Sequence, residues 1–238
     1  MVIIMRKALF TFVAMVISLS AGAQNIQLHY DFGRSFYSNQ EAERQKVTMT
    51  IEQFKADRWG SWFYFVDFDF SRHFVEGAYT EVSREFNIKK ESPFALHVEY
   101  DGGLTRKYAF QQAGLLGFAY NRHSADFSKT WSVQVLYKQF FSNEDIHSYP
   151  SFQLTGVWGI NFLNNKMRFS GFVDFWRAEN SRNGHGMIVF LTEPQLWYNF
   201  TEHFSVGTEV EMSNNFITNF YDGKTFFVNP TLAVKWNM

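Results

Sequence analysis

Residues 60–70 read GSWFYFVDFDF, and their side chains alternate in character from one residue to the next. One set is entirely apolar and consists of Trp62, Tyr64, Val66, Phe68 and Phe70. The other set mixes rings with polar groups and consists of Ser61, Phe63, Phe65, Asp67 and Asp69. Because successive side chains of a strand point to opposite faces, this stretch predicts a β-strand with one apolar face and one partly polar face.

The same period of two recurs along the rest of the chain. Marking each alternating segment predicts twelve strands, at 25–33, 46–56, 60–70, 78–88, 93–101, 107–121, 126–140, 150–162, 166–178, 186–199, 204–212 and 225–238. The connections alternate in length. The long, polar ones are 34–45, 71–77, 141–149, 179–185 and 213–224. The short ones are 57–59, 89–92, 122–125, 163–165 and 200–203, and only 102–106 is shorter than this rule predicts.

An even number of alternating strands, with long connections at one rim and short ones at the other, is typical of outer-membrane barrels. We therefore predict an all-β fold: a transmembrane antiparallel β-barrel of about twelve strands, with short periplasmic turns and longer extracellular loops. A secreted β-sandwich would also alternate, but segments such as 107–121 are much longer than its usual strands of roughly five or six residues. Pro194 interrupts the predicted strand 186–199 and predicts a bulge or bend there.

Composition excludes several other classes of protein. The chain has 238 residues, of which 20% are aromatic, and it carries a formal net charge of −1. Because basic and acidic residues are nearly equal in number, the composition shows no excess of positive charge for binding nucleic acid. The absence of Cys excludes disulfide scaffolds, thiol nucleophiles and zinc–cysteine sites. A mean hydropathy of −0.25 fits a barrel whose lipid face and wet face cancel in the average. We expect no cofactor and no metal.

The N-terminal 1–23 has the pattern of a secretory signal peptide. Arg6 and Lys7 precede an apolar stretch at 8–19, and Ala21-Gly22-Ala23 forms a small-residue cleavage site. The apolar stretch is too short to span the roughly 30 Å of a bilayer core. We predict that 24–238 forms a single mature domain, a monomeric barrel in the outer membrane of a Gram-negative bacterium, with the lipid bilayer and a small solute as its partners.

In such a barrel, function is carried by the face that points into the lumen. The candidate solute-contacting residues are Glu52, Phe54, Phe63, Phe65, Asp67, Asp69, Glu99, Asp101, Phe172, Asp174, Trp176 and Trp197. Carboxylates outnumber basic side chains on this face, although the register of 78–88 and 107–121 is open by one residue. An acidic lumen attracts cations and rejects phosphate-bearing anions. Rings beside carboxylates suit a flat, neutral, hydrogen-bond-donating solute such as a nucleoside. The alternative is a narrow barrel filled by its own side chains.

Residues 48–67, TMTIEQFKADRWGSWFYFVD, contain the order Thr-x-x-x-Glu-x-Phe-x-x-Asp-x-Trp followed by Tyr64 and Asp67. This segment resembles the early strand hairpin of the Tsx-like nucleoside-specific channels of Gram-negative outer membranes, and of related Bacteroides-type outer-membrane proteins. The resemblance implies a monomeric twelve-stranded channel for passive nucleoside uptake. It also implies that Glu52, Phe54 and Asp67 face solute, whereas Asp57 and Trp59 build the short turn.

Two other functions are alternatives to a channel. A lipid hydrolase in a barrel needs a Ser and a His two residues apart on one face, but His123-Ser124 and His147-Ser148 are adjacent pairs, and Ser181 and His185 lie in a loop. We therefore predict no enzymatic activity. The second candidate function is a closed structural or adhesive barrel that binds partners through its loops. Aromatic side chains in those loops are Phe36, Tyr37, Phe216, Phe220 and Tyr221.

Overall fold

The computed structural model describes residues 23–238 except 73, 144–145, 181–183 and 218–224. Its strands are β1 (Ala23–Asp31), β2 (Val47–Asp57), β3 (Gly60–Phe70), β4 (Val75–Asn87), β5 (Phe94–Thr105), β6 (Ala113–His123), β7 (Lys129–Phe140), β8 (Tyr149–Phe162), β9 (Met167–Glu179), β10 (Gly186–Thr192), β11 (Gln195–Asn199), β12 (Phe204–Asn214) and β13 (Phe226–Asn237). A four-residue helix, α2 (Gly33–Phe36), follows β1. The predicted signal peptide lies outside the described residues except for Ala23.

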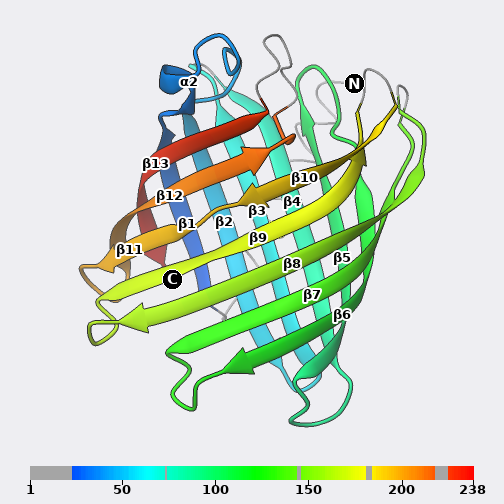
Figure 1. Ribbon diagram of the computed structural model, residues 1–238. Coiled ribbons are helices and arrows are strands. Elements are labelled where there is room, and N and C mark those ends of the chain that lie inside the picture. The colour runs from blue at the N-terminus through cyan, green and yellow to red at the C-terminus, as the bar shows by residue number, and fades with distance from the viewer. Residues whose placement is uncertain (1–22, 73, 144–145, 181–183, 218–224) are drawn as a thin grey trace.

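The strands close into one antiparallel barrel (Figure 1), which confirms the predicted fold class. From β1 to β9 each strand pairs with its sequence neighbours, and β1 pairs with β13 to close the sheet. β10 and β11 both lie between β9 and β12, so these two short strands are halves of a single position. The thirteen strands therefore occupy the twelve barrel positions that the alternation predicts.

The break between β10 and β11 falls at Glu193 and Pro194, which confirms the predicted bend. A Cβ on the facing Gly171 would lie 2.5 Å from the Glu193 carbonyl oxygen and 2.9 Å from the Pro194 Cα. Glycine is therefore required for the two backbones to approach so closely. The ladder resumes past the break, where the Val210 amide donates to the Pro194 carbonyl oxygen.

The long and short connections lie at opposite ends of the barrel, as predicted (Figure 1). One correction concerns the segment after β5. The predicted strand 107–121 begins only at Ala113, and 106–112 is a loop joined to the end of β5 by a bridge between Leu104 and Ala109. The apolar alternation of this loop is strand-like, but its Phe110 ring packs against Gly103. The connection is therefore long after all, and the exception at 102–106 disappears.

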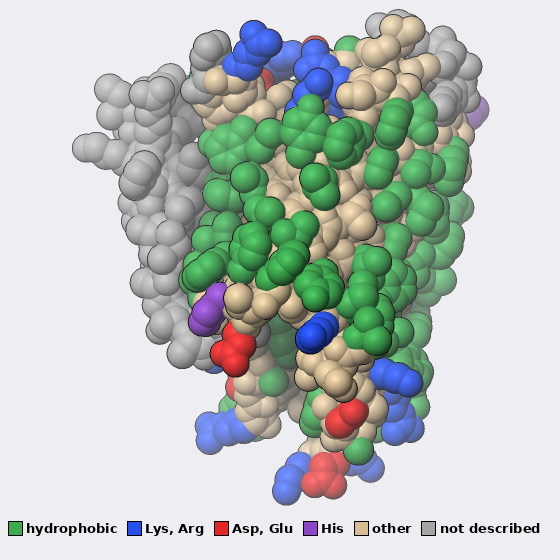
Figure 2. Space-filling view, turned by 90° about the vertical axis from the view of Figure 1, so that its left-hand side faces the viewer, with side chains coloured by type: hydrophobic (Ala, Val, Ile, Leu, Met, Phe, Trp, Pro, Cys, Tyr) green, Lys and Arg blue, Asp and Glu red, His purple; other side chains and the backbone are tan. Residues whose placement is uncertain are grey.

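The outer face carries a belt of exposed apolar side chains (Figure 2). Neighbours in β7 show how sharply the faces differ, because Val135 is 61% exposed and Leu136 only 2%. Val135 points outward, whereas Leu136 faces the interior. An exposed apolar belt between polar ends fits the hydrocarbon layer of a membrane. None of the helices in the described part of the chain has the length and hydropathy of a membrane-spanning helix.

The short turns carry the aromatic and charged side chains expected at a membrane interface. At the β2–β3 turn, an Asp57 carboxylate oxygen accepts from the Trp59 and Gly60 amides at 2.8 and 3.0 Å. The same oxygen accepts from an Arg84 guanidinium nitrogen at 2.9 Å, and that guanidinium lies 5.1 Å from the centre of the outward Trp62 ring. Asp57 therefore builds this turn, in agreement with the role implied by the resemblance.

Candidate functional site in the barrel lumen

The strand register determines which side chains face the lumen, since directly opposed residues share a face of the sheet. Thr50 opposes Asp67, Glu52 opposes Phe65, and Phe54 opposes Phe63. The same rule continues around the barrel and places all twelve predicted residues on the inward face: Glu52, Phe54, Phe63, Phe65, Asp67, Asp69, Glu99, Asp101, Phe172, Asp174, Trp176 and Trp197. They do not form a single site, because eight of them divide among three environments. Of the other four, Glu52 accepts from the Asn25 amide at 3.1 Å and Asp174 accepts from the Thr155 hydroxyl at 2.5 Å.

The first environment is a row of rings along β3, β4 and the loop 106–112. The ring centres of Phe63 and Phe65 are 6.1 Å apart, those of Phe65 and Tyr79 are 6.0 Å apart, and those of Tyr79 and Phe110 are 5.9 Å apart. All four side chains are half-buried. We call Phe63, Phe65, Tyr79 and Phe110 the aromatic ladder. It follows the inner wall from near the short-turn end toward the long-loop end.

Sequence reasoning missed Tyr79 and Phe110. The signal for Tyr79 was its spacing of two residues from the inward Glu81, but the register of that strand was open. Phe110 lies in the first part of the predicted strand 107–121, which is a loop in the structure. The Tyr79 hydroxyl donates to a Glu81 carboxylate oxygen at 2.9 Å, so the ladder is tied to the acidic groups beside it.

Carboxylates flank the aromatic ladder. The Thr50 hydroxyl donates to Asp67 at 2.5 Å, and the Thr48 hydroxyl donates to Asp69 at 2.7 Å. Both acids are half-buried on β3. Hydroxyl donors of this kind hold a carboxylate in place without neutralising it. Within the described residues, neither Asp67 nor Asp69 takes part in an ion pair.

The second environment is a more deeply buried acidic cluster. Single carboxylate oxygens of Glu81, Glu99 and Asp101 all lie within 4.8 Å of one another. The Lys138 ammonium donates to Asp101 at 2.9 Å and to the Gln153 side-chain oxygen at 2.7 Å. Three such oxygens are ligands that a divalent cation accepts. In this cluster, the ammonium of Lys138 already supplies the opposing charge.

His97 extends the cluster toward the short-turn end. It is 2% exposed, and its two ring nitrogens lie 3.3 Å from a Glu85 oxygen and 2.9 Å from a Glu99 oxygen. The second Glu85 oxygen accepts from the Asn121 amide at 2.6 Å. The imidazole is therefore held between two acids, and its geometry is that of a structural link in a buried network.

The third environment consists of interior side chains that are buried against one another. Five interior side chains of β6, β7 and β8 are buried together: Ala113, Leu115, Leu136, Phe140 and Tyr149. Trp176 packs against this cluster, and the Lys138 ammonium lies 5.2 Å from the centre of its ring. Trp197 is fully buried, with its indole N–H donating to Gln195 at 2.9 Å. Trp176 and Trp197 thus face inward as predicted but are packed among other side chains.

The loop between α2 and β2 folds into the mouth of the barrel at the long-loop end. The Arg44 guanidinium donates to Asp31 at 2.8 Å and to Glu211 at 2.9 Å. Glu41 accepts from the Asn229 amide at 2.8 Å. Since Asp31, Glu211 and Asn229 lie on the inner faces of β1, β12 and β13, the loop covers that side of the opening. We call residues 37–46 the mouth strap.

The pKa values of two charged residues in the mouth strap are shifted by burial and by neighbouring charges. Burial raises the pKa of the Glu41 carboxyl above its ordinary 4.5, although Arg44 and the Asn229 hydrogen bond oppose the shift. Burial by itself would lower the pKa of Arg44, but Glu211 and Asp31 outweigh it and raise that pKa. Arg44 therefore stays charged. Of the two loop aromatics predicted here, Tyr37 packs on Phe227 with ring centres 5.1 Å apart, whereas Phe36 is 63% exposed.

The two adjacent His-Ser pairs are not arranged as nucleophile and base. The Ser124 hydroxyl donates to Asp126 at 2.5 Å in a short turn, while the His123 ring stacks on Phe127. The Ser148 hydroxyl donates to the Phe140 carbonyl oxygen at 2.8 Å. Residues 181–183 and 218–224 lie outside the described ranges. The loop position of Ser181 therefore stays a prediction, as does the role of Phe220 and Tyr221 in binding partners.

Two solved structures share this architecture. One is the NanC porin in a rhombohedral crystal form, with a TM-score of 0.59 and 9% identity, covering 91% of this chain and 99% of that chain. The other is the KdgM porin in complex with disordered oligogalacturonate, with a TM-score of 0.52 and 11% identity, covering 91% of this chain and 99% of that chain. At such low identity, the likeness establishes the barrel fold alone.

Sequence comparison gives the family. None of the curated proteins matches the chain. A family profile described as "Domain of unknown function (DUF5020)" matches residues 23–238, which run from the first strand to the last. The chain therefore belongs to the DUF5020 family, and its fold is a closed antiparallel barrel of the kind found in outer-membrane porins.

Proposed function

We propose that the protein is an outer-membrane channel for passive uptake of small neutral or cationic solutes, nucleosides among them. The observation that carries the proposal is the half-buried aromatic ladder flanked by the carboxylates of Asp67, Asp69 and Glu81. This wall offers flat apolar contact and hydrogen-bond acceptors along one continuous line. Weak sites in series raise the flux of a scarce solute without any input of energy.

The sign of the lumen charge selects the class of solute. Two inward basic side chains are held by acids, since Lys138 binds Asp101 and Arg44 binds Asp31 and Glu211. Two others are not, because Arg168 donates to the Asn161 side chain and the Lys235 ammonium lies over the Trp197 ring. Within the described residues, Asp67 and Asp69 are bound by threonine hydroxyls and by no basic side chain. A polyanion such as the oligogalacturonate of the KdgM complex would be repelled by such a wall. Neutral and cationic solutes would not.

The shape of the ladder supports a flat solute. Its neighbouring ring centres are about 6 Å apart, which is within the range of aromatic contacts. A nucleoside can place its base against one ring and its hydroxyls on the adjacent carboxylates. The nucleoside part of the proposal also draws on the Tsx-like order of residues 48–67, which includes the inward Glu52, Phe54 and Asp67.

Ion selectivity tests the charge of the lumen. The purified protein in a planar bilayer under a salt gradient should show a reversal potential of cation preference, and D67N/D69N should move that potential toward zero. The matched control is E91Q, because the Glu91 side chain is 85% exposed in the turn at 88–93. An unchanged potential in D67N/D69N, or an equal change in E91Q, would contradict the assignment of these two acids to the conducting path.

Solute flux tests the ladder. Liposomes that contain the protein should take up adenosine faster than empty liposomes, and F63A/F65A should lose much of that advantage. The control is F118A, since Phe118 is 59% exposed on the lipid face. Uptake no faster than in empty liposomes would defeat the nucleoside proposal. Uptake that F63A/F65A leaves unchanged would remove the ladder from the path.

A second candidate function is a closed structural barrel that binds partners through its loops. It is favoured by the buried interior cluster around Leu115 and Leu136, and by the mouth strap anchored through Arg44. Bilayer recordings separate the two functions. Discrete conductance steps that nucleosides block support a channel, whereas silence at every voltage supports the closed barrel.

A further inference from the structure

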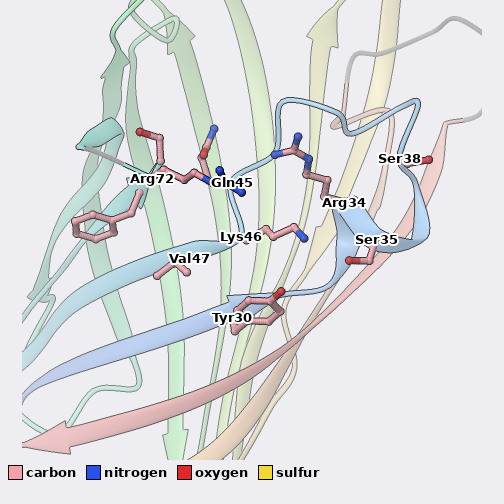
Figure 3. Close-up of a pocket in the computed structure, with 10 residues that line it drawn as sticks. Tyr30, Arg34, Ser35, Ser38, Gln45, Lys46, Val47 and Arg72 are labelled. Atoms are coloured by element: carbon pink, nitrogen blue, oxygen red, sulfur yellow. The ribbon is translucent and has the colours of Figure 1, made fainter.

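A large groove lies outside the lumen, on the outer face of the barrel at its long-loop end. Its volume is about 970 Å³, and its walls come from the end of β1, α2, the mouth strap, the start of β2 and the end of β3 (Figure 3). The lining residues are Tyr30, Arg34, Ser35, Ser38, Gln45, Lys46, Val47, Phe70, Ser71 and Arg72. Conduction through the lumen does not involve this groove.

The floor of the groove belongs to the lipid face of the barrel. Tyr30 opposes Val47, and Val47 opposes Phe70, so the three form one row across β1, β2 and β3. The neighbouring Asp31 points the other way, into the lumen, where it binds Arg44. The row is therefore the uppermost part of the apolar belt. Whatever lies on it is in contact with the outer edge of the membrane.

Above this floor the groove is basic. Arg34 comes from α2, Lys46 from the end of the mouth strap and Arg72 from the segment after β3. Figure 3 shows the side chains of Arg34 and Lys46 in the space above the Tyr30 ring. All three cations are exposed, and none of the described residues that line the groove is acidic. Figure 2 shows Lys and Arg side chains gathered at the same end, directly above the apolar belt.

Nearby acids do not neutralise these cations. Glu41 is bound to Asn229, and Glu43 is bound to Lys107 at 3.1 Å. Within the described part of the chain, Arg34, Lys46 and Arg72 take part in no ion pair. Lys138 and Arg44 differ in this respect, because each is held by carboxylates inside the barrel. Three cations converging without an acid form a site for an anion with several oxygen atoms.

An apolar floor at the membrane edge, beneath a cluster of free cations, matches an amphiphile with an anionic head. The volume exceeds what a lone phosphate fills and lies in the range of sites for larger molecules. We propose that this groove binds a phosphorylated glycolipid of the outer leaflet, with its phosphate on Arg34, Lys46 and Arg72 and an acyl chain along Tyr30, Val47 and Phe70. The proposal rests on the outer-membrane location but not on conduction through the lumen.

Binding to the purified, folded protein in detergent tests this proposal. The probe is a bis-phosphorylated, acylated glucosamine disaccharide, detected as a bound lipid by native mass spectrometry and by titration. R34Q/K46Q/R72Q should weaken binding by about a hundredfold or more, because the variant loses every charge-assisted hydrogen bond from these three side chains to the phosphate. The matched control is K89Q/K90Q, which removes two exposed lysines from the turn at the opposite end.

Further probes identify the source of the anion. The dephosphorylated glycolipid should bind far more weakly, and inorganic phosphate should not compete at concentrations similar to those of the lipid. Equal binding of the dephosphorylated lipid would overturn the proposal in favour of a purely apolar surface. Competition by inorganic phosphate would overturn it in favour of a soluble anion. Unchanged affinity in R34Q/K46Q/R72Q, with folding verified by the heat-dependent gel mobility of the barrel, would overturn it outright.

Discussion

The wall formed by β2–β5 and the wall formed by β6–β8 face the same lumen but present opposite surfaces to it. The first wall carries the half-buried aromatic ladder with Asp67 and Asp69. The second carries the buried cluster of Leu115, Leu136 and their neighbours. Both walls come from strands of the same period. The difference shows that alternation determines which side chains point inward. The size and charge of those side chains determine whether they pack into a buried cluster or line an accessible wall.

Lys138 lies at the boundary between the two walls, and its loss should have the largest effect. K138M leaves Asp101 and its acidic neighbours without the ammonium that lies 2.9 Å away. Removing one partner of a buried ion pair costs about 3–5 kcal/mol. We expect that loss in urea unfolding of the protein in detergent micelles, with partial recovery in K138M/D101N. A loss below about 1 kcal/mol would mean that water already reaches the acidic cluster.

Two adjacent residues of β7 test whether the second wall is a packed core. L136A should lower the free energy of unfolding by about 2–4 kcal/mol, because it removes buried methyl groups and leaves a cavity. V135A removes methyl groups on the lipid face, where acyl chains fill the space, so it should cost roughly 1–1.5 kcal/mol. Equal losses for the two variants would show that the interior of this half is open.

A substitution in the mouth strap should have a smaller effect, and it tests how far the lumen is covered at its long-loop end. R44Q loses two charge-assisted contacts, to Asp31 and Glu211, and should destabilise the docked strap by about 1–3 kcal/mol. Single-channel conductance should rise because the side of the mouth over β1, β12 and β13 is uncovered. K107Q is the control, since it breaks only an exposed pair with Glu43. An equal conductance in R44Q and the parent would place the strap outside the path.

The smallest expected effect is a change of channel conductance with pH, caused by titration of Glu41. Burial raises the pKa of Glu41 in the docked strap, so docking binds a proton more tightly than the free loop does. Docking is therefore favoured at low pH and weakens as pH rises through that raised pKa. Conductance should increase over this interval, while the pKa of Arg44 is raised and its charge stays constant. E41Q should flatten the curve, and an unaltered curve in E41Q would assign the response to another group.

Much of the fold was predictable from the sequence, because period two is a local property of the chain. The alternation of residues 60–70 determines both the strand and the face of Asp67 and Phe63. Loop 106–112 escaped prediction because Tyr108 and Phe110 alternate like strand residues, and only the packing of Phe110 on Gly103 separates loop from strand. The break at Pro194 was readable because proline removes a backbone donor wherever it stands.

The candidate site was less predictable, because it depends on contacts across the lumen. Trp176 and Trp197 share the inward face with Phe63, but they are packed among other side chains. Nothing in their own strands distinguishes them from the half-buried rings of the aromatic ladder. The mouth strap was equally hidden, since the partners of Arg44 lie on β1 and β12, 13 and 167 residues away. Burial of inward residues therefore needs the assembled barrel.

The seam between the first and last strands has a consequence for the order of folding. His29 on β1 contacts the Thr231 hydroxyl on β13 at 3.2 Å across a separation of 202 residues. Contacts so distant along the chain cost the most loop entropy and slow folding. The hairpins from β2 to β9 can form from local contacts, whereas this seam needs both ends of the barrel to be present. We therefore expect closure of the seam to be the last and slowest step of assembly, with the lumen taking its final shape only then.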